Sequence, residues 1–279
     1  MRPRGRAAVS ALLALLVAAV ALFPFLWQVR TSVLPDRQLY AVPVEWWPEI
    51  ASLAEAATHY RRVFALRPFH RNLLNSAVVA AWTTANCLVL GALAAFVLAR
   101  LRVRGGQLWL ALVLAVALFP PVVTLSPLYL VFQRLGLLNT YPALVLPYTT
   151  FALPLTLWIL TAFFRQIPRE LTEAALVDGC SPLSALVRVV LPLAAPGLAA
   201  AALLVFIYSW NELLFALAFT FDDRARPVTA ALALFPGERE TPWGEVAAAS
   251  VIVTLPLVAL VLVAQRRIVA GLTAGALKG

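Results

Sequence analysis

Charged residues are scarce in this sequence. Asp, Glu, Lys and Arg together make up 13% of its 279 residues, about half the share found in an average soluble domain. Hydrophobic residues account for 62%, and the mean hydropathy is +0.88. This composition excludes an ordinary soluble domain and predicts an integral membrane protein.

Residues that carry covalent or metal chemistry are also rare. The two cysteines lie in different surroundings, Cys87 in an apolar run and Cys180 in a polar stretch, so no disulfide is expected. The two histidines, His59 and His70, are 11 positions apart, which is not a metal-ligand spacing. No G-x-x-x-x-G-K-[ST], H-E-x-x-H or G-x-S-x-G pattern occurs. The sequence therefore predicts no catalytic residue, no metal site and no cofactor.

Long uncharged runs predict the fold class, an all-α integral membrane protein with six transmembrane helices. A helix needs about 20 apolar residues to cross about 30 Å of hydrocarbon, and an open sheet would leave backbone groups unpaired in lipid. The first run could be a signal peptide, but its 23 uncharged residues lead into bulky ones, which favours an uncleaved span. The predicted spans are 7–29, 72–99, 105–133, 135–164, 189–221 and 246–265.

The basic residues predict how these spans are oriented. One side of the membrane receives 12 basic residues and three acids, from the N-terminus, the 100–104 loop, the polar stretch 166–192 and the C-terminal tail. The other side carries 10 basic and nine acidic residues, most of them in two long segments. Because Lys and Arg accumulate in cytoplasmic loops, both termini and the polar stretch are expected in the cytoplasm. We interpret the net charge of +9 as this orientation signal and expect no nucleic-acid partner.

This arrangement predicts four parts along the chain. Residues 1–30 hold the cytoplasmic N-terminus and the first span, and 31–70 form an extracytoplasmic segment with an amphipathic helix. Residues 71–265 form the helical core, and 266–279 form a cytoplasmic tail. In the outer segment, tryptophans over 36–60 suit the headgroup level. Residues 221–245 read as a loop with a short apolar centre, and either outer segment is a docking surface or a simple lid.

The polar stretch 166–192, here called the elbow, carries the signals of two short helices. Pro168 is expected at the first position of one helix, and Gly179 suits the left-handed residue that ends it. Ser181 and Pro182 are the expected cap and first residue of the second helix, and Pro192 is expected to end it. One apolar stripe follows at helical spacing: Leu183, Leu186, Val187 and Val190. The stripe either packs on the membrane or under the bundle, or fits a groove on a cytoplasmic partner.

Glu212 is the one acid within a predicted span. A carboxylate inside a membrane seldom faces lipid. It either lines a substrate path together with Tyr208, Trp210 and Asn211, since sugars are bound by polar groups beside aromatic faces, or it fixes its helix to a neighbour or lies near the outer end of the span. The structural role is the interpretation we favour.

The elbow sequence "EAALVDG", followed by a second helix and Leu191–Pro192, resembles the EAA motif of permease subunits in binding-protein-dependent ABC importers. Other segments resemble the carbohydrate branch of that family: "NSAVVAAWTTANCLVLGALAAFVLARLRVRG", "LGLLNTYPALVLPY", "FFRQIPRELTEAALVDG", "SWNELLFAL" and "GLTAGALKG". The resemblance covers essentially the whole chain and is weakest over 36–60. Cys180 stands where a small residue is usual.

The resemblance implies a type I importer permease fold with a cytoplasmic coupling-helix elbow, in a bacterial or archaeal plasma membrane. It implies these partners: a second permease subunit, two ATPase subunits, an extracytoplasmic sugar-binding protein and the lipid bilayer. The residues that it assigns to ATPase coupling are Glu173, Ala174, Ala175, Asp178, Gly179, Leu183, Leu186, Val187, Leu191 and Pro192. By this analogy Glu173 fixes the elbow by charge-assisted hydrogen bonds, the two alanines allow close approach, Gly179 makes the bend, and the tail over 271–279 also touches the ATPase.

Two alternatives stay open at this level. The same architecture could carry another cargo, such as a glycerol phosphate or a polyamine. An ion-driven secondary transporter would need a relay of intramembrane charges, for which Glu212 alone is thin support.

Overall fold

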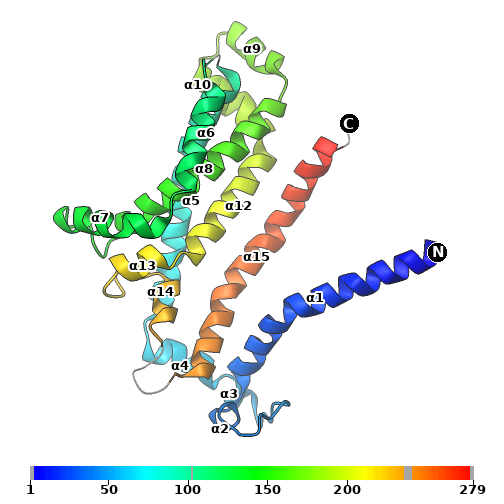
Figure 1. Ribbon diagram of the computed structural model, residues 1–279, viewed down its shortest axis with the longest axis vertical. Helices are drawn as coiled ribbons and strands as arrows, with labels where there is room; N and C mark the ends of the chain where they lie inside the picture. Colours follow the sequence, from blue (N-terminus) through cyan, green and yellow to red (C-terminus); the bar gives the residue numbers. More distant parts are fainter. Residues whose placement is uncertain (1–2, 102, 236–240, 277–279) are drawn as a thin grey trace. The chain divides into compact units, whose positions relative to one another are not determined.

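The computed structural model of this chain describes residues 3–101, 103–235 and 241–276, with the side chains described over 9–101, 103–235 and 241–265. All regular structure in these ranges is helical (Figure 1). The chain divides into two compact units. Met1–Phe69 and Leu232–Leu255 form unit 1, and His70–Ala231 with Pro256–Gly279 form unit 2.

Unit 1 is built around the first helix, α1 (Pro3–Val33), which is apolar on all sides and carries no acidic residue. Short helices follow it: α2 (Asp36–Leu39), α3 (Leu53–Ala56) and α4 (Thr58–Leu66). Helix α4 packs against α1, and the buried ring of His59 bonds to the carbonyl of Leu34 at 2.8 Å. The first part of α15 (Trp243–Ala276) completes unit 1.

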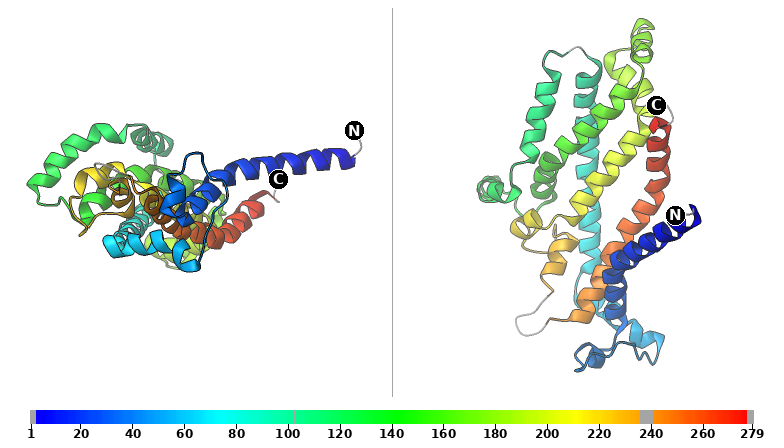
Figure 2. Two further views of the ribbon diagram at one scale, coloured as in Figure 1. Left: turned by 90° about the horizontal axis from the view of Figure 1, so that it is seen from below. Right: turned by 45° about the vertical axis from the view of Figure 1, so that its right-hand side comes forward.

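Unit 2 contains the long helices α5, α8 and α12, together with the elbow and the loop over 220–227. Helices α6 and α12 pack on α8, and α13 packs on α7 and α8 (Figures 1 and 2). Its helices before the elbow are α5 (Phe69–Arg100), α6 (Gly106–Ala117), α7 (Pro121–Arg134) and α8 (Tyr141–Gln166). The elbow and the segments after it form α9 (Arg169–Val177), α10 (Pro182–Ala185), the π-helical turn η1 (Leu186–Val190), α11 (Leu191–Leu193), α12 (Ala195–Asn211), α13 (Leu214–Phe219) and α14 (Val228–Ala233).

The six predicted spans appear as four continuous helices and two bent pairs. α1, α5, α8 and α15 are each long and apolar enough to cross a membrane. The span predicted over 105–133 is two helices that meet at 83°. Its break lies at Pro120 and Pro121, which lack the N–H groups that would continue α6. The prediction of one continuous helix over 105–133 was therefore wrong.

The span predicted over 189–221 is also divided. The helical stretch Pro182–Leu193 bends by 83° into α12, which ends at Asn211. Pro196 lies in the first turn of α12, where its missing N–H costs no hydrogen bond. The prediction was right about α12 but wrong in joining it to the elbow helix before and to α13 after.

Two larger apolar clusters of described residues hold unit 2 together, beside a small one of Cys87, Ala152 and Val205. One joins α5, α8, the π turn and α12, with Phe96, Phe164 and Leu186 fully or almost fully buried. The other joins α5, α7, α8 and α13 around Tyr148 and Phe215. Helices α8 and α12 approach so closely that a Cβ added at Gly197 would overlap the ring of Phe163.

Candidate functional site: the elbow

The elbow begins where α8 ends, and an arginine from α5 holds that end. Arg100 donates hydrogen bonds to the carbonyl oxygens of Phe164 at 2.5 Å and Ile167 at 2.7 Å. The last carbonyls of a helix have no partner within it, so this cation satisfies two of them. We had interpreted Arg100 only as an orientation signal, because nothing in the local sequence links it to residues more than 60 positions away.

The first elbow helix, α9, ends in a Schellman motif. The N–H of Cys180 bonds to the carbonyl of Ala175 at 2.9 Å, and that of Gly179 bonds to Leu176 at 3.1 Å. Gly179 has φ +88°, the left-handed region that a residue with a Cβ rarely adopts. The predicted role of Gly179 as the bend is confirmed. Pro168 is the residue before α9, one position earlier than predicted.

The second elbow helix begins as predicted and ends differently. The hydroxyl of Ser181 accepts the N–H of Ser184 at 3.2 Å, and Pro182 occupies the first turn. The helix then widens into the π turn and runs on to Leu193, past Pro192, which was predicted to end it. Proline lacks an N–H, and its ring clashes with the carbonyl four residues earlier. A π turn directly before Pro192 makes room for that ring, so the helix continues.

The apolar stripe of the second helix divides between two environments. Leu186 (2% exposed) and Val190 are buried in the bundle cluster. Leu183 (59% exposed) and Val187 lie outside it, along an apolar groove of about 350 Å³ that α5 also lines. The interpretation of packing under the bundle therefore accounts for the buried half of the stripe, and the other half is free for a partner.

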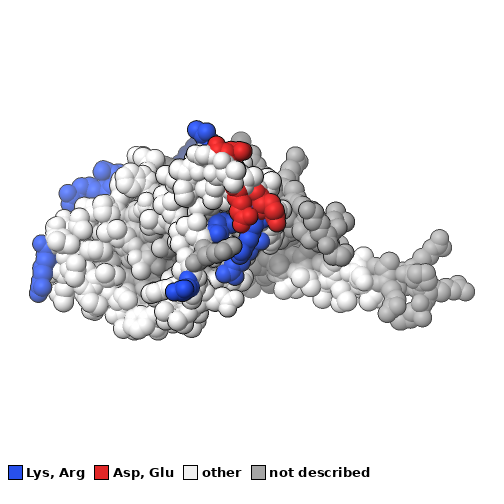
Figure 3. Space-filling view, turned by 90° about the horizontal axis from the view of Figure 1, so that it is seen from above, with Lys and Arg blue, Asp and Glu red and all other residues white. Residues whose placement is uncertain are grey.

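The residues of the EAA motif lie mainly on the surface of α9. Glu173, Ala174 and Asp178 are exposed, and Ala175 is half-buried. Glu173 makes no hydrogen bond or ion pair with any described residue, so the predicted charge-assisted bonds are not formed within the described ranges. Figure 3, which views the molecule from the α9 end, shows acidic and basic side chains gathered on a largely uncharged face.

Glu212 lies outside any helix, which corrects its placement inside a span. The chain leaves the α conformation there (ψ 129°) at the end of α12. Its carboxylate accepts the backbone N–H groups of Phe215 at 3.1 Å and Ala216 at 3.3 Å. Free N–H groups open every helix, so this acid caps α13.

The other candidate path residues do not share one environment. Tyr208 is partly buried against two apolar clusters. Trp210 is buried and stacks on Phe206 with ring centroids 5.6 Å apart. Asn211 is exposed and donates to the carbonyl of Ile207 in its own helix. No common substrate-facing surface of these residues emerges in the described part of the chain.

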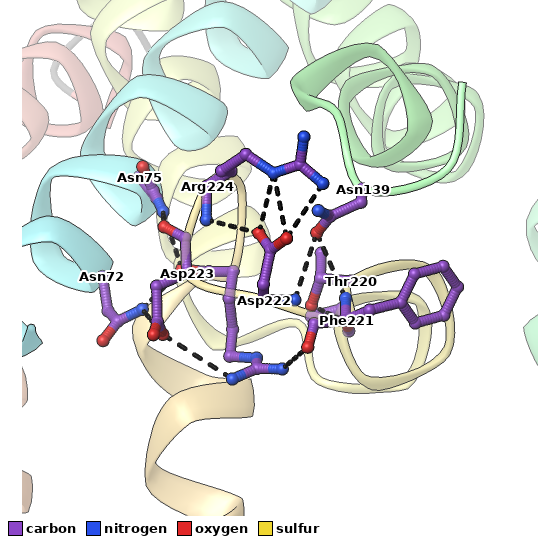
Figure 4. A network of polar contacts seen from close by, with 10 residues as sticks. Asn72, Asn75, Asn139, Thr220, Phe221, Asp222, Asp223 and Arg224 are labelled. Atoms are coloured by element: carbon purple, nitrogen blue, oxygen red, sulfur yellow. Dashed lines mark hydrogen bonds and ion pairs between the residues drawn. The ribbon is translucent and has the colours of Figure 1, made fainter. Parts of the chain in front are cut away.

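The loop over 220–227, at the opposite end of unit 2 from the elbow, is held by amide side chains (Figure 4). Asn75 donates to the carbonyl oxygens of Asp223 and Arg226, both at 3.0 Å, and accepts the hydroxyl of Tyr141 at 2.7 Å. Asn72, one turn earlier on α5, bonds to the same loop.

Asn139 and the loop's own charges complete this network. The Asn139 side chain accepts the N–H groups of Phe221 and Asp222 at 3.1 and 3.4 Å. Arg224 donates to both carboxylate oxygens of Asp222. These hydrogen bonds hold the pKa of Asp222 well below its usual range. Sequence reasoning missed this network because its members are up to 154 positions apart.

Residues 88–273 match the family described as binding-protein-dependent transport system inner membrane component. The chain belongs to this family. As a member it is a multi-pass inner-membrane transport permease rather than an enzyme, and the predicted all-α permease fold is confirmed.

Two curated relatives of this permease cover almost its whole length. It is 43% identical to the trehalose/maltose transport system permease protein MalG of Thermococcus litoralis, over 95% of each chain. It is 41% identical to the sulfoquinovosyl glycerol transport system permease protein SmoH of Agrobacterium fabrum, over 92% of this chain and 89% of the relative. A crystal structure of a bacterial ABC transporter involved in import of the polysaccharide alginate shares the fold (TM-score 0.77, 23% identity, 94% of this chain and 96% of that chain).

The permease tail was also expected to take part in coupling. Helix α15 runs to Ala276. The side chains of 266–276 and residues 277–279 lie outside the described residues, so the predicted contact of 271–279 stays a prediction.

Proposed function

We propose that this permease forms part of the translocation path of an ATP-driven sugar importer. A second permease subunit, two ATPase subunits and an extracytoplasmic binding protein that delivers the sugar complete the transporter. The relatives MalG and SmoH, each above 40% identical, are named for trehalose or maltose and for a sulfoquinovosyl glycerol, which supports a sugar over a polyamine or a glycerol phosphate.

The elbow is the proposed contact with the ATPase. The observation that carries this proposal is its two-sided construction: Leu186 and Val190 are buried in the bundle, while Leu183 and Val187 stay exposed. Because one face of the elbow is packed in the bundle, a movement of the ATPase bound to its exposed face is transmitted to the bundle. The coupling surface consists of Glu173, Ala174, Ala175, Asp178, Leu183 and Val187, with Gly179 as the bend and Leu186, Leu191 and Pro192 as the root.

The elbow and both termini then lie in the cytoplasm, and the 220–227 loop lies outside. The excess of basic residues on the elbow side supports this orientation. Glu212 serves to cap α13 and does not bind the substrate.

The test of the coupling surface is association with the cognate ATPase. Glu173→Lys reverses a charge on the exposed face of α9, and Gly179→Pro is incompatible with φ +88° and removes the N–H bond to Leu176. Both variants should insert into the membrane at normal yield, yet lose at least about 90% of co-purifying ATPase, the loss that a penalty of about 1.4 kcal/mol produces.

Two matched variants control for damage to the fold. Glu170→Lys makes the same charge change one turn earlier on α9. Gly136→Pro affects a glycine with φ +66° whose N–H bonds to a helix-end carbonyl in the same way, in the loop after α7. Both controls should retain the ATPase. If Glu173→Lys and Gly179→Pro also retain it, the elbow is not the coupling surface.

The cargo is tested on the extracytoplasmic binding protein that associates with this permease. A thermal-shift screen should give the largest stabilisation with a mono- or oligosaccharide. Stabilisation by polyamines or glycerol phosphate alone would remove the sugar assignment and leave the coupling proposal intact.

A further inference from the structure

The tryptophan-rich segment over 40–50 turns back along α1. Arg30 of α1 donates its Nε–H to the carbonyl oxygen of Trp46 at 2.9 Å and a second hydrogen bond to the carbonyl of Glu45. The ring of Trp46 packs edge-on against Trp27, with centroids 5.8 Å apart. The Arg30 guanidinium lies over the Trp27 ring at 4.7 Å. The chain therefore leaves α1 at Val33 and returns to the level of residues 27–30.

A second set of bonds fixes this return. Gln38 donates to the carboxylate of Glu45 at 2.6 Å and accepts the backbone N–H of Glu49 at 3.1 Å. Both hydrogen bonds lie within unit 1, which also contains Trp27 and Arg30. The backbone over 45–49 is thus tied to α1 and to the short α2 that follows it.

The length of α1 places this return at the membrane boundary. The apolar stretch Val9–Val33 has 25 residues, about 37 Å of helix at about 1.5 Å per residue. The hydrocarbon layer is about 30 Å thick, so a few ångströms of helix extend beyond it. Trp27 lies six residues before the end of α1, about 9 Å along the axis, which is the depth of the headgroup–acyl boundary.

The segment presents apolar side chains at that depth that no described residue covers. Val42 is 96% exposed, Trp47 85% and Trp46 67%. None of the 18-residue window that defines the α1 span is buried within this chain either, so the exposed segment is continuous with an exposed apolar helix. Tryptophan favours the boundary because its ring is apolar and its N–H remains hydrogen-bonded to headgroups or water.

We propose that residues 40–50 form a membrane-interface anchor, with Trp46 and Trp47 embedded among the lipid headgroups beside α1. The occupant of this surface is the bilayer itself. A cleft of about 240 Å³ between the segment and α1, lined by Trp27, Arg30, Val44 and Trp243 among others, gives lipid headgroups a cationic edge and an apolar wall. This inference does not depend on the cargo.

Depth-dependent quenching tests the anchor in the intact transporter. A fluorophore is attached at Trp47→Cys in a chain without Cys87 and Cys180, and the complex is placed in phosphatidylcholine–phosphatidylglycerol nanodiscs. Lipids with a nitroxide at the headgroup or at acyl carbon 5 should quench at least about threefold more than lipids labelled at carbon 12, since the aromatic belt is shallow.

Val177→Cys is the matched control, because Val177 of the elbow is 87% exposed, almost the same as Trp47. It should show no lipid quenching. Absence of quenching at position 47 would mean that water or another protein covers the segment, and strongest quenching by carbon 12 would place it inside the hydrocarbon. Either result overturns the proposal.

The return along α1 is tested by Arg30→Gln, which removes the charge over Trp27 and the paired hydrogen bonds to 45 and 46. Shallow-lipid quenching at position 47 should fall by about threefold as the segment loosens. Arg61→Gln changes an exposed arginine of α4 and should leave quenching unaltered. Unchanged quenching in Arg30→Gln would show that Arg30 does not set the depth.

Discussion

Two polar segments interrupt the apolar helices of unit 2, the elbow over 166–192 and the loop over 220–227. The elbow is fixed by burying Ala185, Leu186 and Val190 in the bundle. The 220–227 loop is fixed by side-chain amides that bond to its backbone. Burial is non-directional and leaves the opposite face of the elbow free for a partner, whereas hydrogen bonds define the position of each loop residue. The elbow, which keeps one face exposed, and the 220–227 loop, which is held in place residue by residue, are therefore attached to the bundle in different ways.

The largest expected effect comes from the buried root of the elbow. Leu186→Ala removes a side chain from a packed cluster and should lower the stability of the permease by about 2–5 kcal/mol, measured by denaturation in detergent micelles. Leu183→Ala, on the exposed half of the same stripe, should change stability little and reduce ATPase association. Equal stability losses for both variants would show that Leu183 is packed as tightly as Leu186 and that the stripe has no separate exposed half.

The amide attachment of the 220–227 loop is tested next. Asn75→Ala leaves the carbonyl of Asp223 and the Tyr141 hydroxyl without this partner, while the carbonyl of Arg226 keeps its bond from Asn72, and each orphaned group costs about 1–3 kcal/mol. Hydrogen exchange over the loop should accelerate at least tenfold while the elbow stays protected. Asn211→Ala, whose amide bonds only within its own helix, is the control and should leave the loop unaffected.

A smaller effect is expected at the end of α12. Glu212→Ala removes the acceptor of two helix N–H groups, a loss of about 0.5–2 kcal/mol. Assembly of the transporter should fall more than the affinity for its substrate, and Glu212→Gln should restore part of the assembly. An intact complex with altered sugar selectivity would instead place Glu212 in the translocation path.

The smallest effect is that of pH on the 220–227 loop. The folded pKa of Asp222 is lowered by Arg224, so this carboxylate stabilises the loop above its unfolded pKa of about 4. The contribution decreases below that value and is lost as the pH falls through the folded pKa. A spin label at Phe221→Cys should therefore keep the same mobility from pH 8 to about pH 4 and become more mobile only well below that pH, as the folded carboxylate becomes protonated. In Asp222→Asn this transition should be absent.

The sequence predicted the elbow well because its signals are local. Gly179, Ser181 and Pro182 each act on residues within a few positions, through backbone angle, capping or a missing N–H. The positions of Gly179 and Ser181 were predicted correctly. The predicted end of the second elbow helix was one to two residues too early, because the π turn accommodates Pro192.

The network around the 220–227 loop could not be predicted in the same way. Asn72, Asn75 and Asn139 look like ordinary polar residues next to apolar runs, and only folding brings them to the loop. The position of Glu212 failed for a related reason. Counting uncharged residues gives the length of an apolar run. It does not show that the Glu212 carboxylate accepts the N–H groups of Phe215 and Ala216, so that α12 ends before it and α13 begins after it.

Gly244, at the start of α15, lies so close to α4 that an added Cβ would overlap the imidazole of His59. The hydroxyl of Tyr40 likewise bonds to the carbonyl of Thr241 at 3.0 Å. Nearly 200 residues must leave the ribosome between the two halves of these contacts. During translation the segment that holds Tyr40 and α4 therefore stays without these contacts until α15 has been made.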